Sequence, residues 1–139
     1  MTVPAAPLYL DTSAVLRVVL EGGTTPEVER SLRAAPVLLT SRLSLVESAR
    51  ALIRARTVPG VSAERLADAE REIEAIWARC EVWELTRGVC ELARQVAPTK
   101  GLRTLDALHL ATFLLARRKI EGIALLTADE RLRDAAGSA

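Results

Sequence analysis

Carboxylates at the ends of predicted strands are the residues of this sequence best suited to chemistry. Of its 139 residues only five are aspartates, and three of these, Asp11, Asp106 and Asp129, stand at or near the start of a predicted helix. Asp11 directly follows an apolar run over 8–10, and Asp129 follows one over 123–126. In open α/β sheets the functional crevice lies outside the carboxyl ends of the parallel strands, so we expect these two side chains to be close neighbours.

Asp106 and Glu47 are the other acidic candidates. Asp106 opens a helix that is apolar nearly all round, which predicts burial of the helix and partial desolvation of a carboxylate at its mouth. Desolvation raises the pKa of a carboxyl group unless a cation or hydrogen-bond donors keep it ionised. Glu47 lies opposite the apolar stripe of its predicted helix, where it faces a cleft or plain solvent. That stripe consists of Leu45, Val46, Ala49, Leu52 and Ile53.

A group of three or four carboxylates is stable mainly when a divalent cation neutralises it, because like charges repel strongly at short range. Mg²⁺ or Mn²⁺ suits such a group, since Mg²⁺ prefers oxygen ligands, keeps several waters and bridges carboxylates to phosphate oxygens. One of those waters can become the nucleophile, and two ions can stabilise both the attacking and the leaving oxygen. One ion and two ions both remain open. The predicted catalytic and metal-binding residues are Asp11, Glu47, Asp106 and Asp129.

Each of these acids also has a purely structural interpretation. Any one of the three aspartates fits a helix cap or a first-turn acid favoured by the helix dipole. Thr127 and Glu130 match the capping-box pattern S/T-x-x-E. Glu47, together with Arg50 and Arg54, fits an ordinary charged helix face.

Polar residues close to the acids are expected to play supporting roles. His109, one turn after Asp106, is expected to be a packed or hydrogen-bonded core histidine rather than a catalytic base. Thr12, Ser13 and Thr127 are expected to be helix caps that also orient the waters of the metal.

The composition excludes several ways of binding nucleic acid. The net charge is +1, so there is no overall basic field. However, 17 of the 19 basic residues are Arg, whose guanidinium binds phosphate through two parallel hydrogen bonds. Aromatic residues make up 3%, which argues against modules that stack bases on exposed rings. Recognition of RNA would therefore run through backbone phosphates. The candidate arginines for such contacts are Arg17, Arg42, Arg50 and Arg103.

The remaining bulk features predict one domain in the cytoplasm. The chain is long enough for one sizeable core, it contains no apolar stretch of membrane-helix length, and its first residues lack a signal-peptide pattern. Cys80 and Cys90 form no CxxC pair and cannot complete a zinc site with His109, so we expect reduced thiols.

Short β-like runs alternate with longer helical ones, which is typical of βαβ units around a parallel sheet, so the predicted class is α/β. The predicted strands cover 8–10, 37–40, 81–85 and 123–126, the last of them buried. Helices are predicted from 14, over 42–56, over 62–79 with Ser62 as cap, over 86–96, over 104–118 and after 129. The segment 22–26 should end the first helix and start another.

Four segments complete the sequence evidence. They read YLDTSAVL from Tyr9, SLVESARAL from Ser44, LDALHLAT from Leu105 and LLTADERL from Leu125. Taken in this order, they resemble the PIN-domain family, and within it the VapC-type ribonuclease toxins. The resemblance extends from Leu8 to about Ala135, and LDTSA and LDALHLAT are its specific pieces.

The resemblance implies a fold and an activity. The fold would be a small central parallel sheet flanked by helices in three α/β/α layers, occupying residues 1–139 as one domain. The activity would be a Mg²⁺- or Mn²⁺-dependent endoribonuclease that uses a metal-activated water and leaves a 5′-phosphate. Such proteins are usually homodimers inhibited by a small antitoxin that covers the active-site groove. The family's acids fall on Asp11, Glu47, Asp106 and Asp129, and its supporting hydroxyls on Ser13 and Thr127.

The sequence departs from the family at one place and leaves two rival functions. Family members commonly finish with a further short strand, whereas this chain continues as RLRDAA from Arg131 into Gly137-Ser-Ala. A phosphatase with a strand-end aspartyl nucleophile would need a second Asp two residues after Asp11, where Ser13 stands. A non-catalytic module that binds protein or RNA would have no need to keep four acids that repel one another.

Overall fold

One parallel sheet organises the chain. The computed structural model describes residues 5–21 and 26–139. Within these residues four strands are hydrogen-bonded in the order β3-β2-β1-β4, and every pairing is parallel. The strands are β1 (Leu8–Leu10), β2 (Leu38–Ser41), β3 (Cys80–Trp83) and β4 (Ala124–Leu126). β1 therefore lies between β2 and β4, so the residue after β1 stands in the middle of the carboxyl edge.

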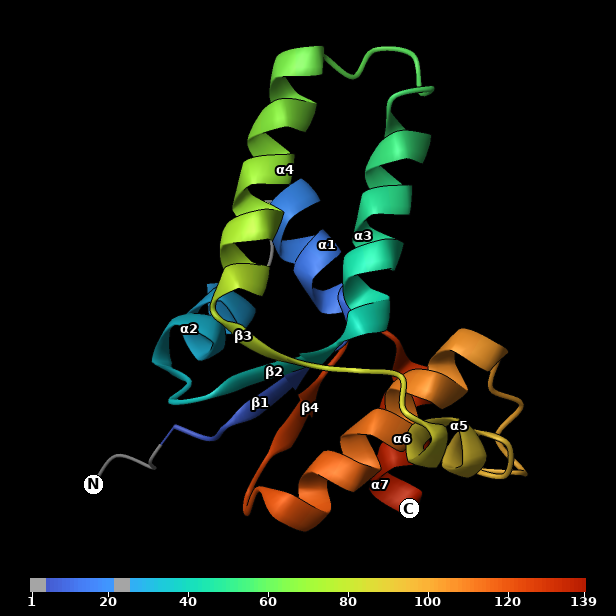
Figure 1. Ribbon diagram of the computed structural model, residues 1–139. Helices are drawn as coiled ribbons and strands as arrows, with labels where there is room; N and C mark the ends of the chain where they lie inside the picture. Colours follow the sequence, from blue (N-terminus) through green and yellow to red (C-terminus); the bar gives the residue numbers. More distant parts are fainter. Residues whose placement is uncertain (1–4, 22–25) are drawn as a thin grey trace.

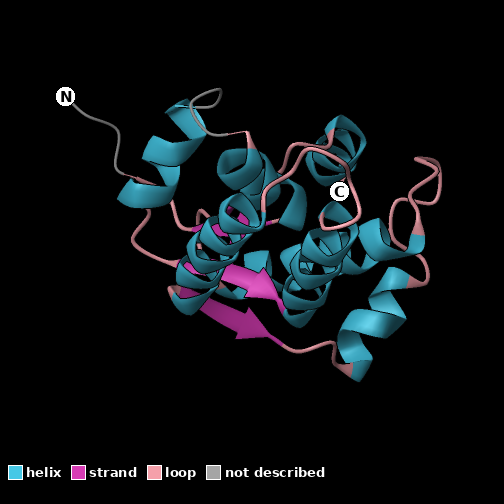
Figure 2. Cartoon of the chain, turned by 90° about the horizontal axis from the view of Figure 1, so that it is seen from above, coloured by secondary structure: helices cyan, strands magenta, loops and turns pink. Residues whose placement is uncertain are grey.

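Helices cover both faces of this sheet. They are α1 (Thr12–Leu20), α2 (Pro26–Ala34), α3 (Arg42–Ala55), α4 (Ala63–Ala78), α5 (Arg87–Ala93), α6 (Thr104–Lys119) and α7 (Glu130–Ser138). In Figure 1 α1, α3 and α4 lie above the sheet, and α5, α6 and α7 lie below it. Figure 2 looks down on the upper helices, which partly hide the strands. The α/β class and the three-layer arrangement are confirmed.

The alternation of side chains along β1 explains the two helical layers. Leu8 and Leu10 point into a core with residues of α1 and α4, whereas Tyr9 points into a second core with residues of α6 and α7. Successive side chains of a strand face opposite sides of a sheet, so one apolar tripeptide supplies both cores. All three residues of β1 are buried, as expected for a central parallel strand.

Several element boundaries differ slightly from the prediction. β2 is shifted by one residue, β3 is shorter than 81–85, and α5 ends at Ala93, before the left-handed backbone of Ala97 at φ 44°. The predicted cap of α4 is confirmed, since the Ser62 side chain accepts a hydrogen bond from the backbone N–H of Arg65. Residues 22–25 of the predicted helix break lie outside the described residues, and α2 begins directly after them at Pro26.

The prediction for the last strand was wrong in one respect. β4 stands at an edge of the described sheet, and its first residue, Ala124, is exposed rather than buried. The residues after Asp129 form α7 as predicted. Among the residues that the structure describes, no strand pairs with the outer side of β4.

The predicted buried stripe of α3 was wrong in part, since Leu52 is buried and Leu45 packs against the core as predicted, but Ala49 is exposed. Val46 is 56% exposed and Ile53 is 42% exposed, whereas the buried face of α3 carries Ser44, Ser48 and Leu52 at four-residue spacing. Small hydroxyl residues can form a buried contact face here because their hydrogen bonds are satisfied. Ser44 accepts a hydrogen bond from Thr40, and Ser48 accepts one from the Trp77 indole. None of the described helices is long and apolar enough to cross a bilayer.

The contrast between two adjacent residues of α3 tests this corrected face. Leu52→Ala is expected to lower the free energy of unfolding by about 2–4 kcal/mol, because it opens a cavity in the core. Ile53→Ala is the matched control and should cost less than about 1 kcal/mol. Urea unfolding followed by circular dichroism measures both values. Equal losses for the two variants would contradict the assignment of the buried face.

Candidate metal centre

Asp11 stands at the centre of the carboxyl edge. It follows β1, precedes α1 and is 5% exposed, and its backbone N–H donates to the carbonyl of Leu126 at the end of β4. The loop after β4 lies against this position, because the backbone N–H of Ala128 donates to Oγ of Ser13 at 3.0 Å. The two strand ends that carry Asp11 and Asp129 are thus neighbours, as the sheet topology predicts.

Two hydroxyl groups hold one oxygen of Asp11. Ser13 Oγ donates to Oδ2 at 2.6 Å, and Thr127 Oγ1 donates to the same oxygen at 2.7 Å. Thr12 Oγ1 instead donates to Oε1 of Glu47 at 2.8 Å. The expectation that these three hydroxyls cap helices was wrong, since each is committed to a carboxylate. Asp11 itself occupies the N-cap position of α1 but makes no side-chain cap bond, which leaves its carboxylate for the site.

Glu47 is turned toward His109 rather than toward open solvent. Its side chain is 24% exposed and reaches from α3 to Nε2 of His109, which lies 2.6 Å from Oε1. Desolvation opposes ionisation of Glu47, but the hydrogen bonds from His109 and the Thr12 hydroxyl outweigh it and lower the pKa. The alternative of an ordinary charged face with arginines one turn away does not describe this geometry.

His109 is the residue whose contacts the sequence did not predict. It is 1% exposed and hydrogen-bonded, as expected for a core histidine, with Nδ1 at 2.8 Å from the hydroxyl of Tyr9. Its Nε2 lies between two carboxylates, at 2.6 Å from Glu47 and 3.5 Å from Oδ1 of Asp11. The one usable signal was its position three residues after Asp106, which places both on one side of α6.

The pKa of Asp106 is affected by the negative charges of the other acids. Asp106 is the third residue of α6, its side chain is 22% exposed, and Nε of Arg103 lies 3.9 Å from Oδ2. Its pKa is raised first by desolvation and then by the negative charges of Asp129 and Asp11, against the weaker opposing effect of Arg103. A carboxylate with a raised pKa in the company of other acids is a site that gains from a bound cation.

Asp129 has a structural role in addition to its place at the edge. Its Oδ1 accepts the backbone N–H groups of Arg131 and Leu132, so Asp129 rather than Thr127 is the N-cap of α7. The capping-box interpretation of Thr127 and Glu130 was therefore wrong. Thr127 Oγ1 accepts the N–H of Asp129 and donates to Asp11, so it links the two acids.

The donor set fits a hard divalent cation, although the side chains do not form a complete coordination shell in this arrangement. Within the described residues no group of three or more Asp, Glu, His or Cys side chains is close enough to hold an ion as it stands. The available donors are carboxylate oxygens, which Mg²⁺ and Mn²⁺ prefer. Oε2 of Glu47 and Oδ2 of Asp129 accept no hydrogen bond from the described residues, so both remain for a ligand.

The four candidate RNA-binding arginines differ in their surroundings. Arg103 is at the mouth of the site beside Asp106, and Arg17 lines a hollow of about 540 Å³ that also touches Asp129. Arg42 is held by Glu84 through Nε and Nη2, and Arg50 is exposed on α3. Arg17 and Arg103 are therefore the two that lie beside the acids.

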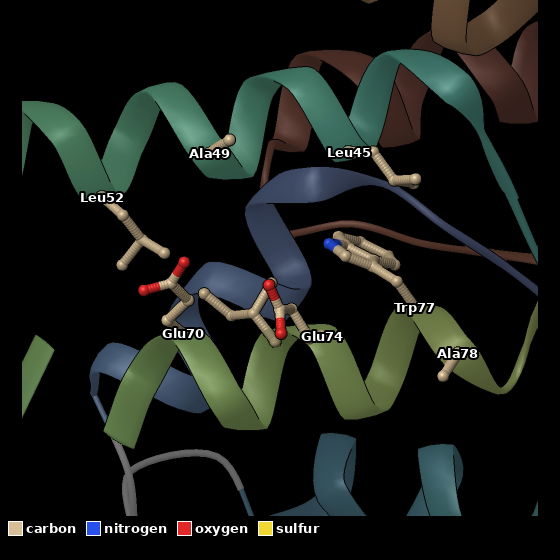
Figure 3. Close-up of a pocket in the computed structure, with 8 residues that line it drawn as sticks. Leu45, Ala49, Leu52, Glu70, Glu74, Trp77 and Ala78 are labelled. Atoms are coloured by element: carbon tan, nitrogen blue, oxygen red, sulfur yellow. The ribbon is translucent and has the colours of Figure 1, made fainter. Parts of the chain in front are cut away.

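A separate apolar groove lies away from the acidic edge. It has a volume of about 400 Å³ and runs between α3 and α4, where Leu45, Leu52 and Trp77 form its walls. Figure 3 shows Glu70 and Glu74 of α4 at one side of this groove. The groove contains none of the four candidate acids, so it is not part of the metal centre.

Comparison with known proteins assigns the class. The PIN domain family profile matches residues 8–138, and the chain therefore belongs to the PIN domain family. Among curated relatives, Ribonuclease VapC45 of Mycobacterium tuberculosis is 34% identical over 137 residues, which cover 95% of this chain and 90% of the relative. Ribonuclease VapC46 of the same organism is 30% identical over 131 residues, with 94% and 91% covered.

Solved structures give the same fold. PAE2754 from Pyrobaculum aerophilum matches with a TM-score of 0.63 and 22% identity, over 97% of this chain and 83% of that one. A toxin–antitoxin complex from Klebsiella pneumoniae matches with a TM-score of 0.61 and 20% identity, over 88% of this chain and 86% of that one. At these identities the likeness shows the shared architecture.

The repulsion among the acids predicts a stabilising substitution. Because its pKa is raised in the fold, Asp106 costs stability in the metal-free protein as the pH rises through that pKa. Asp106→Asn should therefore raise the melting temperature of metal-free protein at pH 7.5 by about 1–3 °C. Differential scanning calorimetry with EDTA measures this change.

The matched control is Asp134→Asn, an exposed acid on α7, which should shift the melting temperature by less than about 1 °C. Added Mg²⁺ should stabilise the wild type but have little effect on Asp106→Asn. A lower melting temperature of metal-free Asp106→Asn would contradict the electrostatic interpretation of the site.

Proposed function

We propose that this PIN domain is a Mg²⁺- or Mn²⁺-dependent endoribonuclease and the toxin of a toxin–antitoxin pair. The observation that carries the proposal is the carboxylate group at the sheet edge, in which Asp11 is fixed by two hydroxyls and Asp106 has a raised pKa. Similarity to proteins named Ribonuclease VapC supports the choice of RNA as substrate.

The residues would divide the work as follows. Asp11, Glu47, Asp106 and Asp129 would hold the metal. A divalent ion there would neutralise charge on the scissile phosphate and lower the pKa of a water. Ser13 and Thr127 keep Asp11 in one orientation by holding Oδ2, so its ligand position is set before substrate arrives.

Arg103 would contact the substrate. Its side chain is 77% exposed beside Asp106, so its guanidinium can bind a backbone phosphate next to the one that is cut.

In the proposed reaction, water adds to phosphorus, the bond to the 3′ oxygen breaks, and the products carry a 3′-hydroxyl and a 5′-phosphate.

The partners follow from the same comparison and are part of the proposal. A small antitoxin protein would bind this chain and cover its active-site groove, and two copies of the chain would form a homodimer in the cytoplasm. The solved toxin–antitoxin complex from Klebsiella pneumoniae, which shares the fold, supports the first of these interactions.

Cleavage of an RNA panel tests the activity. Tag-free wild type is incubated with tRNA, rRNA and mRNA transcripts in Mg²⁺, Mn²⁺ or EDTA, beside Asp11→Asn and Asp106→Asn. Wild type should cut in either metal and not in EDTA, and each variant should lose at least about 100-fold in rate, because a ligand to the ion is removed. Asp134→Asn should cut as fast as wild type.

Three results would overturn the assignment. Undiminished cleavage by both Asn variants would show a contaminating nuclease or a different site. A metal-binding wild type that cuts none of the transcripts would favour the non-catalytic binding module. Detection of a covalent aspartyl phosphate on Asp11 would instead favour the phosphatase, although Ser13 stands where that mechanism needs an acid.

A further inference from the structure

The chain's single histidine is buried at the centre of the site without a function in the scheme above. His109 is 1% exposed, on α6, and reaches two other elements, β1 and α3, through its two ring nitrogens. Nδ1 meets Tyr9 of β1, and Nε2 meets Glu47 of α3 and Asp11 at the end of β1. A buried polar ring that satisfies both nitrogens on site residues is placed to orient those residues.

The partners of the ring determine which nitrogen carries a proton. Ionised carboxylates only accept hydrogen bonds, so Nε2, at 2.6 Å from Glu47 and 3.5 Å from Asp11, must be the donor. Nδ1 can then accept the hydroxyl proton of Tyr9 at 2.8 Å.

The same contacts decide which carboxylate oxygens stay available. Nε2 and the Thr12 hydroxyl both bind Oε1 of Glu47, and Ser13 and Thr127 both bind Oδ2 of Asp11. One oxygen of each acid is thereby occupied, and the other is left for a ligand. Removal of the Nε2–H donor would leave Oε1 of Glu47, on α3, with the Thr12 hydroxyl as its one remaining donor among the described residues.

We propose that His109 is a positioning residue, whose Nε2–H holds Glu47 as a ligand of a divalent cation beside Asp11, while Nδ1 is hydrogen-bonded to the Tyr9 hydroxyl. This inference rests on the proposed function, because it assumes that the acids bind a metal. His109 touches neither the substrate nor the reacting atoms in this scheme.

Nitrogen NMR of the ring tests the tautomer directly. Because the sequence has one histidine, tag-free protein labelled with [¹⁵N]histidine gives the signals of a single ring. In metal-free protein Nε2 should carry a proton, and the ring signals should shift when Mg²⁺ is added. A ring protonated at Nδ1 alone would overturn the proposal.

Metal binding in the absence of RNA tests the positioning role. Calorimetry with Mn²⁺ should show that His109→Leu binds about 10- to 100-fold more weakly than wild type, as is usual when a donor to a metal ligand is removed. His109→Gln, whose amide N–H can reach the place of Nε2–H, should restore most of the affinity. Tyr9→Phe should weaken binding about threefold to tenfold, and it serves if His109→Leu fails to fold.

Ser48→Ala is the matched control. Ser48 is buried on α3 next to Glu47, but its hydroxyl accepts from the Trp77 indole, away from the acids. This variant should lose stability and bind Mn²⁺ as wild type does. Equal Mn²⁺ affinity in wild type, His109→Leu and Tyr9→Phe would overturn the proposal, and so would a loss in Ser48→Ala as large as that in His109→Leu.

The kinetic pattern separates this proposal from the nuclease assignment. If His109 acts through the ligands, saturating Mn²⁺ should restore most of the cleavage rate of His109→Leu, while the Mn²⁺ concentration for half-maximal rate stays raised. Wild type that binds Mn²⁺ but cuts no RNA would overturn the nuclease assignment alone. Wild type that cuts RNA while His109→Leu binds Mn²⁺ unchanged would overturn the role of His109 alone.

Discussion

The hydrogen bonds on Oδ2 of Asp11 are the interaction on which the geometry of this site depends. Ser13 comes from the first turn of α1 and Thr127 from the loop after β4, so one carboxylate oxygen joins two elements that are far apart in sequence. The two hydroxyls also compensate for the burial of a charged group, which would otherwise be costly. The orientation of Asp11 is consequently set by the packing of β1 against β4.

The parallel sheet explains why the sequence alone predicted that Asp11 and Asp129 lie close together. Asp11 and Asp129 each follow an apolar run, and parallel strands end at a common edge, so their proximity needs only the α/β class. The Ser62 cap of α4 was an equally local signal. Features that depend on one segment or on one topological rule could thus be predicted from the residues alone.

Features that depend on the partner of a side chain could not be predicted from the residues alone. The buried face of α3 includes two serines because Thr40 and Trp77 satisfy their hydroxyls, and neither partner is visible in the period of the apolar residues. Thr127 matched a capping box, but Asp129 occupies the cap, and the Thr127 hydroxyl instead joins Asp11 to the backbone of Asp129. His109 was expected in the core, and its two carboxylate contacts depend on how α3 and α6 meet.

The position of β1 between β2 and β4 has a consequence for the chain during synthesis. Translation delivers Asp11 early, but its neighbour Thr127 follows 116 residues later, so the edge cannot assemble on a partial chain. Parallel pairings of such separation also form slowly, because loop closure must precede the contacts that reward it. A growing chain therefore completes this group of acids only when the last strand docks against β1 and brings Asp129 to the edge.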